Sequence, residues 1–153
     1  MTILCFLQNV WVRDPEGLKA IFKRRPEHRV EIIRRLLFAG CLTGRRIKAC
    51  FGEDMLEHMI FEEASLEIAG DARTICLPDT DHIVACFEEY HPQIVLTFGK
   101  IAKDAVYSQW MVWTQFGRIE GKHFISCPHP AARQVDTIKR LKMAAEEIRR
   151  AIA

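Results

Sequence analysis

Several patterns that would point directly to a class of protein are missing from this sequence. No two cysteines form a C-x-x-C pair, and no Cys/His pair has the spacing of zinc ligands. No apolar run approaches the roughly 20 residues that a membrane helix needs. There is no internal repeat or low-complexity linker, and the formal net charge is only +2. These absences argue against a zinc site, a membrane span, a repeat protein and a uniformly basic nucleic-acid binder.

The cysteines indicate a reducing compartment. Several of the six lie in apolar runs, so reduced, buried thiols in a cytoplasmic protein are the favoured interpretation. Disulfides and an iron–sulfur cluster, which needs about four converging cysteines, are the alternatives. The apolar residues 2–7 have no basic residue before them and are expected to form a strand, not a signal peptide. We therefore expect a cytoplasmic protein without a metal or other cofactor.

The length and composition predict one folded domain over residues 1–153. The chain is long enough for a sizeable core, and its 49% apolar and 27% charged residues are ordinary for a globular protein. Short apolar runs predict strands, and intervening amphipathic stretches predict helices. The predicted strands are residues 2–8, 56–61, 94–98 and 123–127.

Helices are expected between and after these strands. They run from Pro26 to Gly40, from a cap at Thr43 to Gly52, from a cap at Asp79 or Thr80 to Pro92, after Gly99-Lys100, and from Gln134 to about Ile152. Residues 8–17 are expected to be a loop, 66–78 a long connection, and 108–120 an aromatic segment of undetermined structure. This alternation predicts an α/β fold: a three-layer αβα sandwich around a four-stranded parallel sheet.

Polar residues follow three of the predicted strands. Gln8 and Asn9 follow the first, Glu62 and Glu63 follow the second, and His129 follows the last. Pro128 and Pro130 flank the histidine and stiffen its backbone. Ligands of open α/β sheets bind at the carboxyl ends of the strands, so these groups form the candidate site.

Basic residues are concentrated in one part of the chain, and they are equally compatible with a solvated surface and a phosphate-binding face. The residues are Lys23, Arg24, Arg25, Arg29, Arg34, Arg35, Arg45, Arg46 and Lys48. Lys100 follows a strand and a glycine, but the rest of the nucleotide-binding P-loop pattern is absent.

Together these segments make the chain similar to the uracil-DNA glycosylase superfamily. Residues 128–133, Pro-His-Pro-Ala-Ala-Arg, resemble the His-Pro-Ala-Ala form of the family's second motif in its thermophilic-type branch. Residues 7–11 occupy the place of the first motif, and residues 94–105 resemble the third strand with its Gly-Lys turn. The resemblance spans nearly the whole chain and implies a glycosylase-like domain.

The resemblance implies roles for two residues. Asn9 would orient the attacking water, although an amide is a weaker catalyst than an aspartate. His129 would donate a hydrogen bond to O2 of the base and stabilise the departing anion. The family's Pro and Gly after the water-positioning residue are replaced by Val10 and Trp11, which could narrow the pocket.

A third departure from the family pattern concerns the residue that recognises the base. Where the family commonly has an Asn that reads the uracil edge, this chain has Glu63, with Glu62 as the alternative. An ionised carboxylate only accepts hydrogen bonds, so we expect a base edge that offers N–H donors, such as a cytosine or adenine amine or a guanine edge.

Further contacts are expected around this site. Gln8 offers an amide to a base edge or a water, and Trp11 and Phe51 are candidates for stacking, ahead of Trp110 and Trp113. Arg133 is a candidate for a phosphate contact at a helix start, or else an ordinary surface residue.

Three functions remain open from the sequence. The first is a cofactor-free DNA glycosylase that hydrolyses the N-glycosidic bond of a flipped, damaged or deaminated base, with DNA as its partner. The second is a catalytically inactive nucleic-acid or nucleobase binder of the same fold. The third is a flavodoxin-like hydrolase that pairs His129 with Glu62 or Glu63 as acid and base. The base, the strand preference and the oligomeric state do not follow from the sequence.

Overall fold

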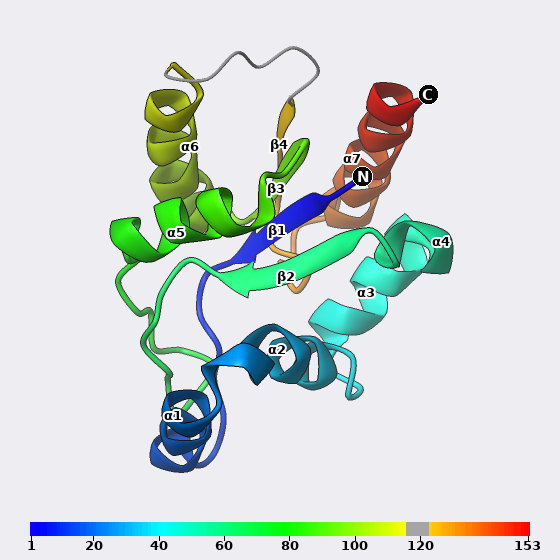
Figure 1. Ribbon diagram of the computed structural model, residues 1–153. Coiled ribbons are helices and arrows are strands. Elements are labelled where there is room, and N and C mark those ends of the chain that lie inside the picture. The colour runs from blue at the N-terminus through cyan, green and yellow to red at the C-terminus, as the bar shows by residue number, and fades with distance from the viewer. Residues whose placement is uncertain (116–122) are drawn as a thin grey trace.

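Four parallel strands form the centre of the protein in the computed structural model, which describes residues 1–115 and 123–153 (Figure 1). The strands are β1 (Ile3–Leu7), β2 (Met59–Glu63), β3 (Ile94–Phe98) and β4 (His123–Cys127). Their order in the sheet is β2-β1-β3-β4, and every neighbouring pair is parallel. The predicted α/β class and four-stranded parallel sheet are confirmed.

Helices cover both faces of this sheet (Figure 1). One face carries α2 (Arg29–Leu37), α3 (Leu42–Phe51), α4 (Glu53–Leu56) and α7 (Thr137–Ile152). The other face carries α5 (Thr80–Tyr90) and α6 (Lys100–Gln115). The helix α1 (Pro15–Arg24) and the short 3-10 helix η1 (Pro26–His28) lie off the sheet, beyond the end of β1. The arrangement is consistent with an αβα sandwich.

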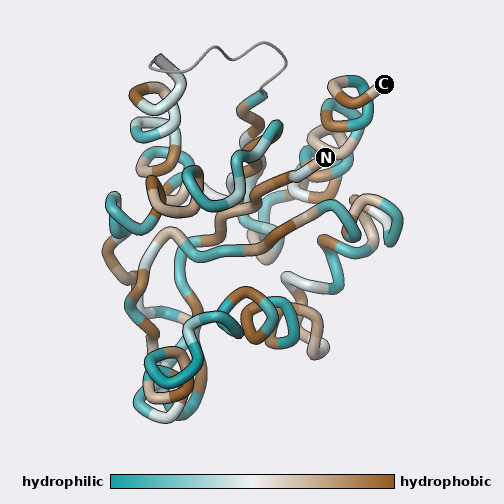
Figure 2. The backbone as a smooth tube through the Cα atoms, viewed as in Figure 1, coloured by the Kyte–Doolittle hydropathy of each residue, from teal (hydrophilic) through white to brown (hydrophobic). Residues whose placement is uncertain are grey.

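The alternation of side chains along β1 divides the interior into two cores. Ile3, Cys5 and Leu7 belong to the core beneath α2, α3 and α7, whereas Leu4 and Phe6 belong to the core beneath α5 and α6. All five residues are buried, as expected for a strand of a parallel sheet that is covered on both faces. Figure 2 shows the resulting contrast between an apolar sheet and helices on which apolar and polar residues alternate.

Local sequence signals explain the helix boundaries near the site. Asp79 caps α5 by accepting a hydrogen bond from the backbone N–H of His82 at 2.9 Å. On α7, Leu141, Ala145 and Ile148 recur at helical spacing and are fully buried. None of the described helices has both the length and the apolar character required to cross a membrane.

The register of the strands brings their carboxyl ends to one edge of the sheet. Leu7 pairs with Glu63, and Phe98 pairs with Cys127. The segments that follow these residues therefore leave the sheet at the same edge. The polar groups that the sequence places after β1, at the end of β2 and after β4 can meet there without any unusual loop.

Three predicted boundaries differ from the observed ones. The second strand occupies 59–63 in place of 56–61, because α4 and its following turn take up 53–58. The last helix begins at Thr137 and not at Gln134. The third helix is capped at Cys41, so Thr43 lies inside it.

Two helices were not expected. The helix α1 begins within the predicted loop 8–17, where Pro15 opens it and the Asp14 carboxylate accepts a hydrogen bond from Gly17 N–H at 3.0 Å. The helix α4 is a single turn. Residues 108–115 of the aromatic segment belong to α6, and the predicted remainder of that segment, 116–120, lies outside the described residues.

Candidate functional site

A cavity with a volume of about 680 Å³ opens at the carboxyl edge of the sheet. It is lined by the segment after β1, the end of β2, the helix α2, the connection after β2 and the loop after β4. Its lining includes Gln8, Asn9, Val10, Trp11, Glu63, Arg73, Cys41 and His129. Each of the three polar groups that the sequence placed at strand ends therefore contributes to one cavity, although Glu63 alone of the two glutamates lines it.

The loop after β4 fixes the histidine in one chemical form. The backbone N–H of Ala131 donates a hydrogen bond to Nδ1 of His129 at 3.1 Å, and Ala132 N–H donates to the His129 carbonyl at 2.9 Å. Since Nδ1 is an acceptor, the neutral ring carries its proton on Nε2. Burial lowers the pKa of His129 below its ordinary value, which favours this neutral form. The ring is thus a neutral Nε2–H donor.

A glycine on the neighbouring strand end lies against this loop. Gly99 follows β3 with a φ of +89°, a conformation that favours glycine. A Cβ atom at this position would lie 3.5 Å from Cβ of His129. The backbone of Gly99 also donates a hydrogen bond to the carbonyl of Cys127 at 2.9 Å. The Gly-Lys turn therefore lies against the histidine loop and is hydrogen-bonded to the end of β4.

An arginine from α3 forms hydrogen bonds with the histidine loop. Nη1 of Arg46 donates to the carbonyl oxygens of Pro130 at 2.7 Å and Ala132 at 3.1 Å. Charged donors make the stronger class of hydrogen bond, so this contact holds the loop to α3. The sequence showed Arg46 only as one member of a basic cluster, and no local pattern distinguished it.

The side chain of Asn9 is already engaged by the protein. Its Oδ1 accepts a hydrogen bond from the backbone N–H of Cys76 at 3.2 Å, and its Nδ2 donates to the carbonyl of Val10 at 3.3 Å. One lone pair on the oxygen and one N–H remain for a ligand or a water. Asn9 therefore lies in the cavity, but it also anchors the connection between β2 and α5.

Glu62 forms a buried ion pair beside the cavity. Its Oε1 accepts hydrogen bonds from Nε of Arg29 at 2.9 Å and from the Glu63 N–H at 3.0 Å, and it lies 3.4 Å from Nε2 of His82. Burial by itself raises the pKa of Glu62, but the contacts with His82 and Arg29 outweigh it and the net pKa is lowered. Glu62 is therefore ionised.

The carboxyl group of Glu63 is in the opposite protonation state to that of Glu62. Its side chain is buried, and Oε2 is fully enclosed without a hydrogen-bond partner. Burial, followed by the negative charge of Glu62, raises the pKa of Glu63 to about 8. At neutral pH it is a carboxylic acid, which has both a donor and an acceptor. The prediction of an ionised, acceptor-only Glu63 is thus corrected by the burial of its side chain.

His129 does not pair with either carboxyl group. No hydrogen bond or ion pair joins it to Glu62 or Glu63 within residues 1–115 and 123–153; Glu62 is bound to Arg29 and His82 instead. The acid–base hydrolase that was left open from the sequence needs such a pair, so this geometry does not support it.

One group of potential metal ligands exists among the described residues. Single ligand atoms of Glu62, His82 and Cys86 lie within 4.8 Å of one another. Arg29 already occupies the same Glu62 oxygen, and burial raises the pKa of the Cys86 thiol well above its ordinary value. A cation and a protonated thiol at this position both disfavour metal binding. The six cysteines are free.

Some of the other residues that were predicted to contact the base or the DNA line the cavity, and some do not. Gln8 and Trp11 line the cavity, and Trp11 is 52% exposed, so its indole is accessible from solvent. An isolated parallel bridge joins Trp11 to Ala69, which fixes the backbone of this segment against the connection after β2. Trp11 is therefore placed where a stacking residue is needed.

Phe51, Arg133 and the two later tryptophans do not line the cavity. Phe51 is 1% exposed and packs edge-on against Phe98 in the core, so its position does not suit stacking. Arg133 is exposed in the loop before α7, four residues ahead of the helix, and is not at a helix start. Trp110 and Trp113 pack with Phe87 between α5 and α6.

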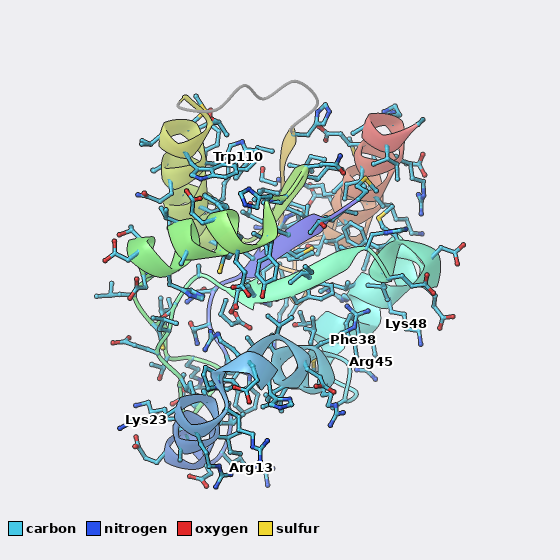
Figure 3. All side chains as sticks on the ribbon, in the orientation of Figure 1. Arg13, Lys23, Phe38, Arg45, Lys48 and Trp110 are labelled. Atoms are coloured by element: carbon cyan, nitrogen blue, oxygen red, sulfur yellow. The ribbon has the colours of Figure 1, made fainter. Side chains whose placement is uncertain are left out.

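The basic cluster separates into two groups. Arg29, Arg34 and Arg46 are partly buried and bind Glu62 or backbone carbonyls. The others are exposed on α1, α2 and α3 or beside them: Lys23, Arg24, Arg25, Arg35, Arg45 and Lys48. Figure 3 labels Lys23 on α1 and Arg45 and Lys48 on α3, pointing outward from the protein. Of this cluster, the exposed group is the part that phosphates can reach.

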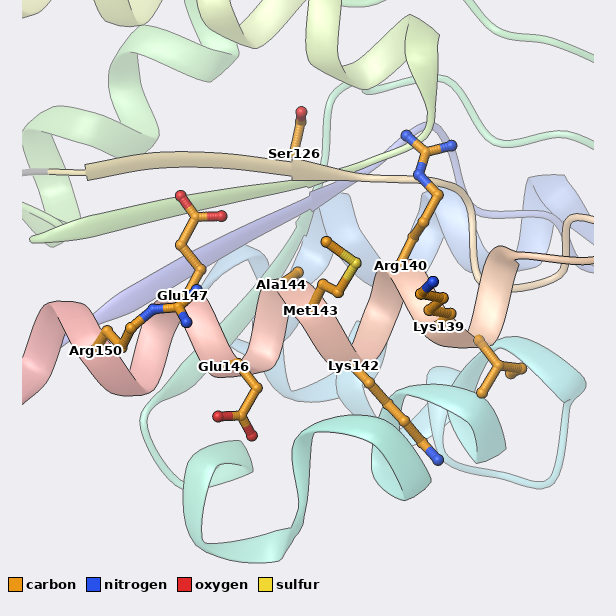
Figure 4. A pocket seen from close by; sticks show the side chains of 10 residues that line it. Ser126, Lys139, Arg140, Lys142, Met143, Ala144, Glu146, Glu147 and Arg150 are labelled. Atoms are coloured by element: carbon orange, nitrogen blue, oxygen red, sulfur yellow. The ribbon is translucent and has the colours of Figure 1, made fainter.

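A second hollow, of about 690 Å³, lies against the outer side of α7 (Figure 4). Ser126 of β4 and the solvent-facing side chains of α7, among them Arg140, Glu147 and Arg150, line it. None of the predicted site residues contributes to it. It is similar in size to the cavity at the strand ends but holds no buried, unpartnered polar group, so the candidate site is the cavity that contains His129.

No protein-family model matches the chain, and no curated protein matches it either. The resemblance to the uracil-DNA glycosylase superfamily therefore stays a prediction that rests on the sequence motifs.

We predict that Arg46→Ala lowers the free energy of unfolding by about 2–3 kcal/mol, because two charge-assisted hydrogen bonds to the histidine loop are lost. Lys48→Ala is the control, since Lys48 is exposed and pairs only with Glu53 on the surface. Its expected effect is below about 0.5 kcal/mol. Chemical denaturation measures both. Equal effects of the two substitutions would show that Arg46 does not hold the loop.

We predict that Glu63→Gln stabilises the protein increasingly as the pH rises. The folded pKa of about 8 exceeds the ordinary 4.5, so the contribution of Glu63 to stability is present at low pH and is lost as the pH rises through about 8. Glutamine removes this loss. The stability difference between variant and wild type should grow by about 3 kcal/mol between about pH 5 and pH 8. A difference that stays constant over this range, as expected for exposed Glu67→Gln, would contradict a neutral Glu63.

Proposed function

We propose that this protein is a DNA glycosylase that hydrolyses the N-glycosidic bond of a flipped, damaged or deaminated base. The observation that carries the proposal is the state of His129: a neutral ring whose Nε2–H is free to donate, in a cavity that also contains Asn9 and Glu63. This donor suits a base that leaves as an anion. The sequence motifs that resemble the uracil-DNA glycosylase superfamily, which include His129 and Asn9, also support it.

The reaction breaks the bond between C1′ of the sugar and the ring nitrogen of the base. The electron pair of that bond goes to the base, whose negative charge spreads onto its carbonyl oxygens. Nε2–H of His129 donates to such an oxygen and stabilises the charge as it develops. A neutral donor is suited to this role because it stabilises the anion without having to transfer its proton.

A water molecule then adds to C1′ and loses a proton to solvent, while the base anion takes up a proton from solvent, which leaves a neutral free base and an abasic sugar. Asn9 orients this water in the proposal, through the N–H and the oxygen lone pair that its contacts with Cys76 and Val10 leave available. An amide does not accept a proton readily, so we expect slow turnover. Exposed basic residues such as Arg73, at the mouth of the cavity, supply attraction for the DNA backbone.

One observation favours a second candidate, a nucleic-acid or nucleobase binder without turnover. The oxygen of Asn9 is bound to the backbone of Cys76, and Val10 and Trp11 line the same cavity. In this alternative Asn9 is a structural anchor, and the cavity retains a base without activating water.

The proposal predicts base release from oligonucleotides that contain uracil, hypoxanthine, xanthine or a thymine mismatch, tested in single strands and in duplexes. His129→Ala should slow release from the preferred substrate by about 10²–10³-fold, since one donor to the developing anion is removed. His58→Ala is the control, because His58 is exposed and lies outside this cavity.

Two results would change the assignment. Tight binding of one of these oligonucleotides without release of any base favours the binder. Release that His129→Ala leaves unchanged contradicts the assigned role of the histidine.

A further inference from the structure

The two glutamates at the end of β2 face opposite sides of the sheet. Successive side chains of a strand alternate in direction, and Glu63 lines the cavity while Glu62 contacts His82 on α5. Because β2 is an edge strand, Arg29 of α2 can reach past it to Oε1 of Glu62. The backbone N–H of Glu63 also donates to that oxygen. The backbone of Glu63 is thus bound directly to the buried ion pair on the other face of the sheet.

The groups around Glu63 supply too little positive charge for two carboxylates. Arg29 is bound to Glu62, and His82 of α5 directs Nε2 toward the Glu63 carbonyl oxygen at 3.1 Å. On the cavity side the titratable groups are neutral His129 after β4, Cys41 before α3, and exposed Arg73 in the connection after β2. Of these, none forms a hydrogen bond or ion pair with the Glu63 carboxyl group, and its Oε2 is enclosed and unpartnered.

We propose that Glu63 recognises the base edge as a neutral carboxylic acid, and that Glu62 is the positioning residue that keeps it neutral. This inference deepens the proposed function and rests on it. When the carboxyl group of Glu63 turns its enclosed, unpartnered Oε2 into the cavity, the neutral form presents one donor and one acceptor side by side, so it pairs with an edge that offers an N–H next to an acceptor. N3–H and O4 of uracil form such an edge.

The neutral state of Glu63 reverses the base preference that was expected from the sequence. An ionised Glu63 would accept from a base N–H but would repel a neighbouring carbonyl oxygen, which leaves uracil with a single hydrogen bond. A protonated Glu63 forms two. Burial and the charge of Glu62 both raise the pKa of Glu63, in agreement with this geometry. Recognition should therefore weaken once the pH rises above about 8.

The protonation state can be measured without any ligand. Infrared difference spectra between the full-length wild type and Glu63→Gln should show the carbonyl band of a protonated carboxylic acid at about pH 6, and the band should be lost at about pH 9. Absence of the band at about pH 6 overturns the inference, whatever the protein binds.

Binding of free uracil then tests recognition. The wild type should lose about tenfold in affinity between about pH 6 and pH 9, the factor by which the neutral form of Glu63 is depleted. Glu63→Gln keeps a donor and an acceptor at both pH values and should lack this loss. Any titration of uracil itself affects both proteins equally and cancels in their ratio. Exposed Glu67→Gln should behave as the wild type.

The role of Glu62 is tested by Glu62→Gln. Removal of its charge leaves Arg29 facing Glu63 alone, so the midpoints of the infrared band and of uracil binding should both move down by about one pH unit or more. A purely structural role for Glu62 would change affinity without moving these midpoints, and that result refutes the positioning role.

The remaining outcomes separate this inference from the proposed function. If the band titrates but uracil binds with the same pH dependence to the wild type and Glu63→Gln, recognition by Glu63 is refuted while a base-binding cavity stands. If the band titrates and uracil does not bind at any pH, the base-binding function is refuted, and recognition of the base by Glu63 with it.

Discussion

Two adjacent carboxyl groups at the end of β2 cannot both carry a charge in this buried position, and the chemistry of the site depends on how the protein resolves that conflict. Arg29 and His82 stabilise the negative charge on Glu62. The charge that remains beside Glu63, together with burial, keeps Glu63 protonated at neutral pH. One strand end thereby supplies a structural ion pair on one face of the sheet and a neutral polar group on the other.

The same edge of the sheet holds a second neutral group, and it is fixed by different means. Backbone contacts within the loop after β4 leave Nε2 of His129 as the donor, and Arg46 holds the carbonyl groups of that loop. The backbone of Gly99 is hydrogen-bonded to the Cys127 carbonyl, where the loop begins. The cavity thus contains polar groups that form hydrogen bonds without adding net charge. Such a lining suits a polar, neutral ring such as a nucleobase, and it is the basis of the proposed glycosylase.

The sequence predicted the part of the fold that depends on short-range patterns. Apolar runs located β1 and β3 to within one residue, because interior strands of a parallel sheet are continuously apolar. The edge strand β4 was located from the shorter apolar run around Phe124 and Ile125. The helix α1 was missed because its signals, Asp14 and Pro15, lie in a segment without a long apolar stripe. The placement of Gln8, Asn9, Glu63 and His129 around one cavity followed from the strand order, since parallel strands end at the same edge.

Contacts between segments that lie far apart in the sequence could not be predicted from it. Arg46 lies 84 residues before the carbonyl group it binds, and nothing in its local sequence separates it from exposed neighbours. The pairing of Arg29 with Glu62 spans 33 residues and decides the ionisation of a third residue, Glu63. Phe51 was assigned to stacking because of its aromatic ring, whereas tertiary packing places it in the core.

The most direct test of this account is a crystal structure of the protein soaked with uracil. The account predicts a base in the cavity at the end of the sheet, with O2 accepting from Nε2 of His129 and the N3–H and O4 edge paired with Glu63. An empty cavity at a saturating concentration of uracil, or a base bound only at the outer side of α7, would contradict it.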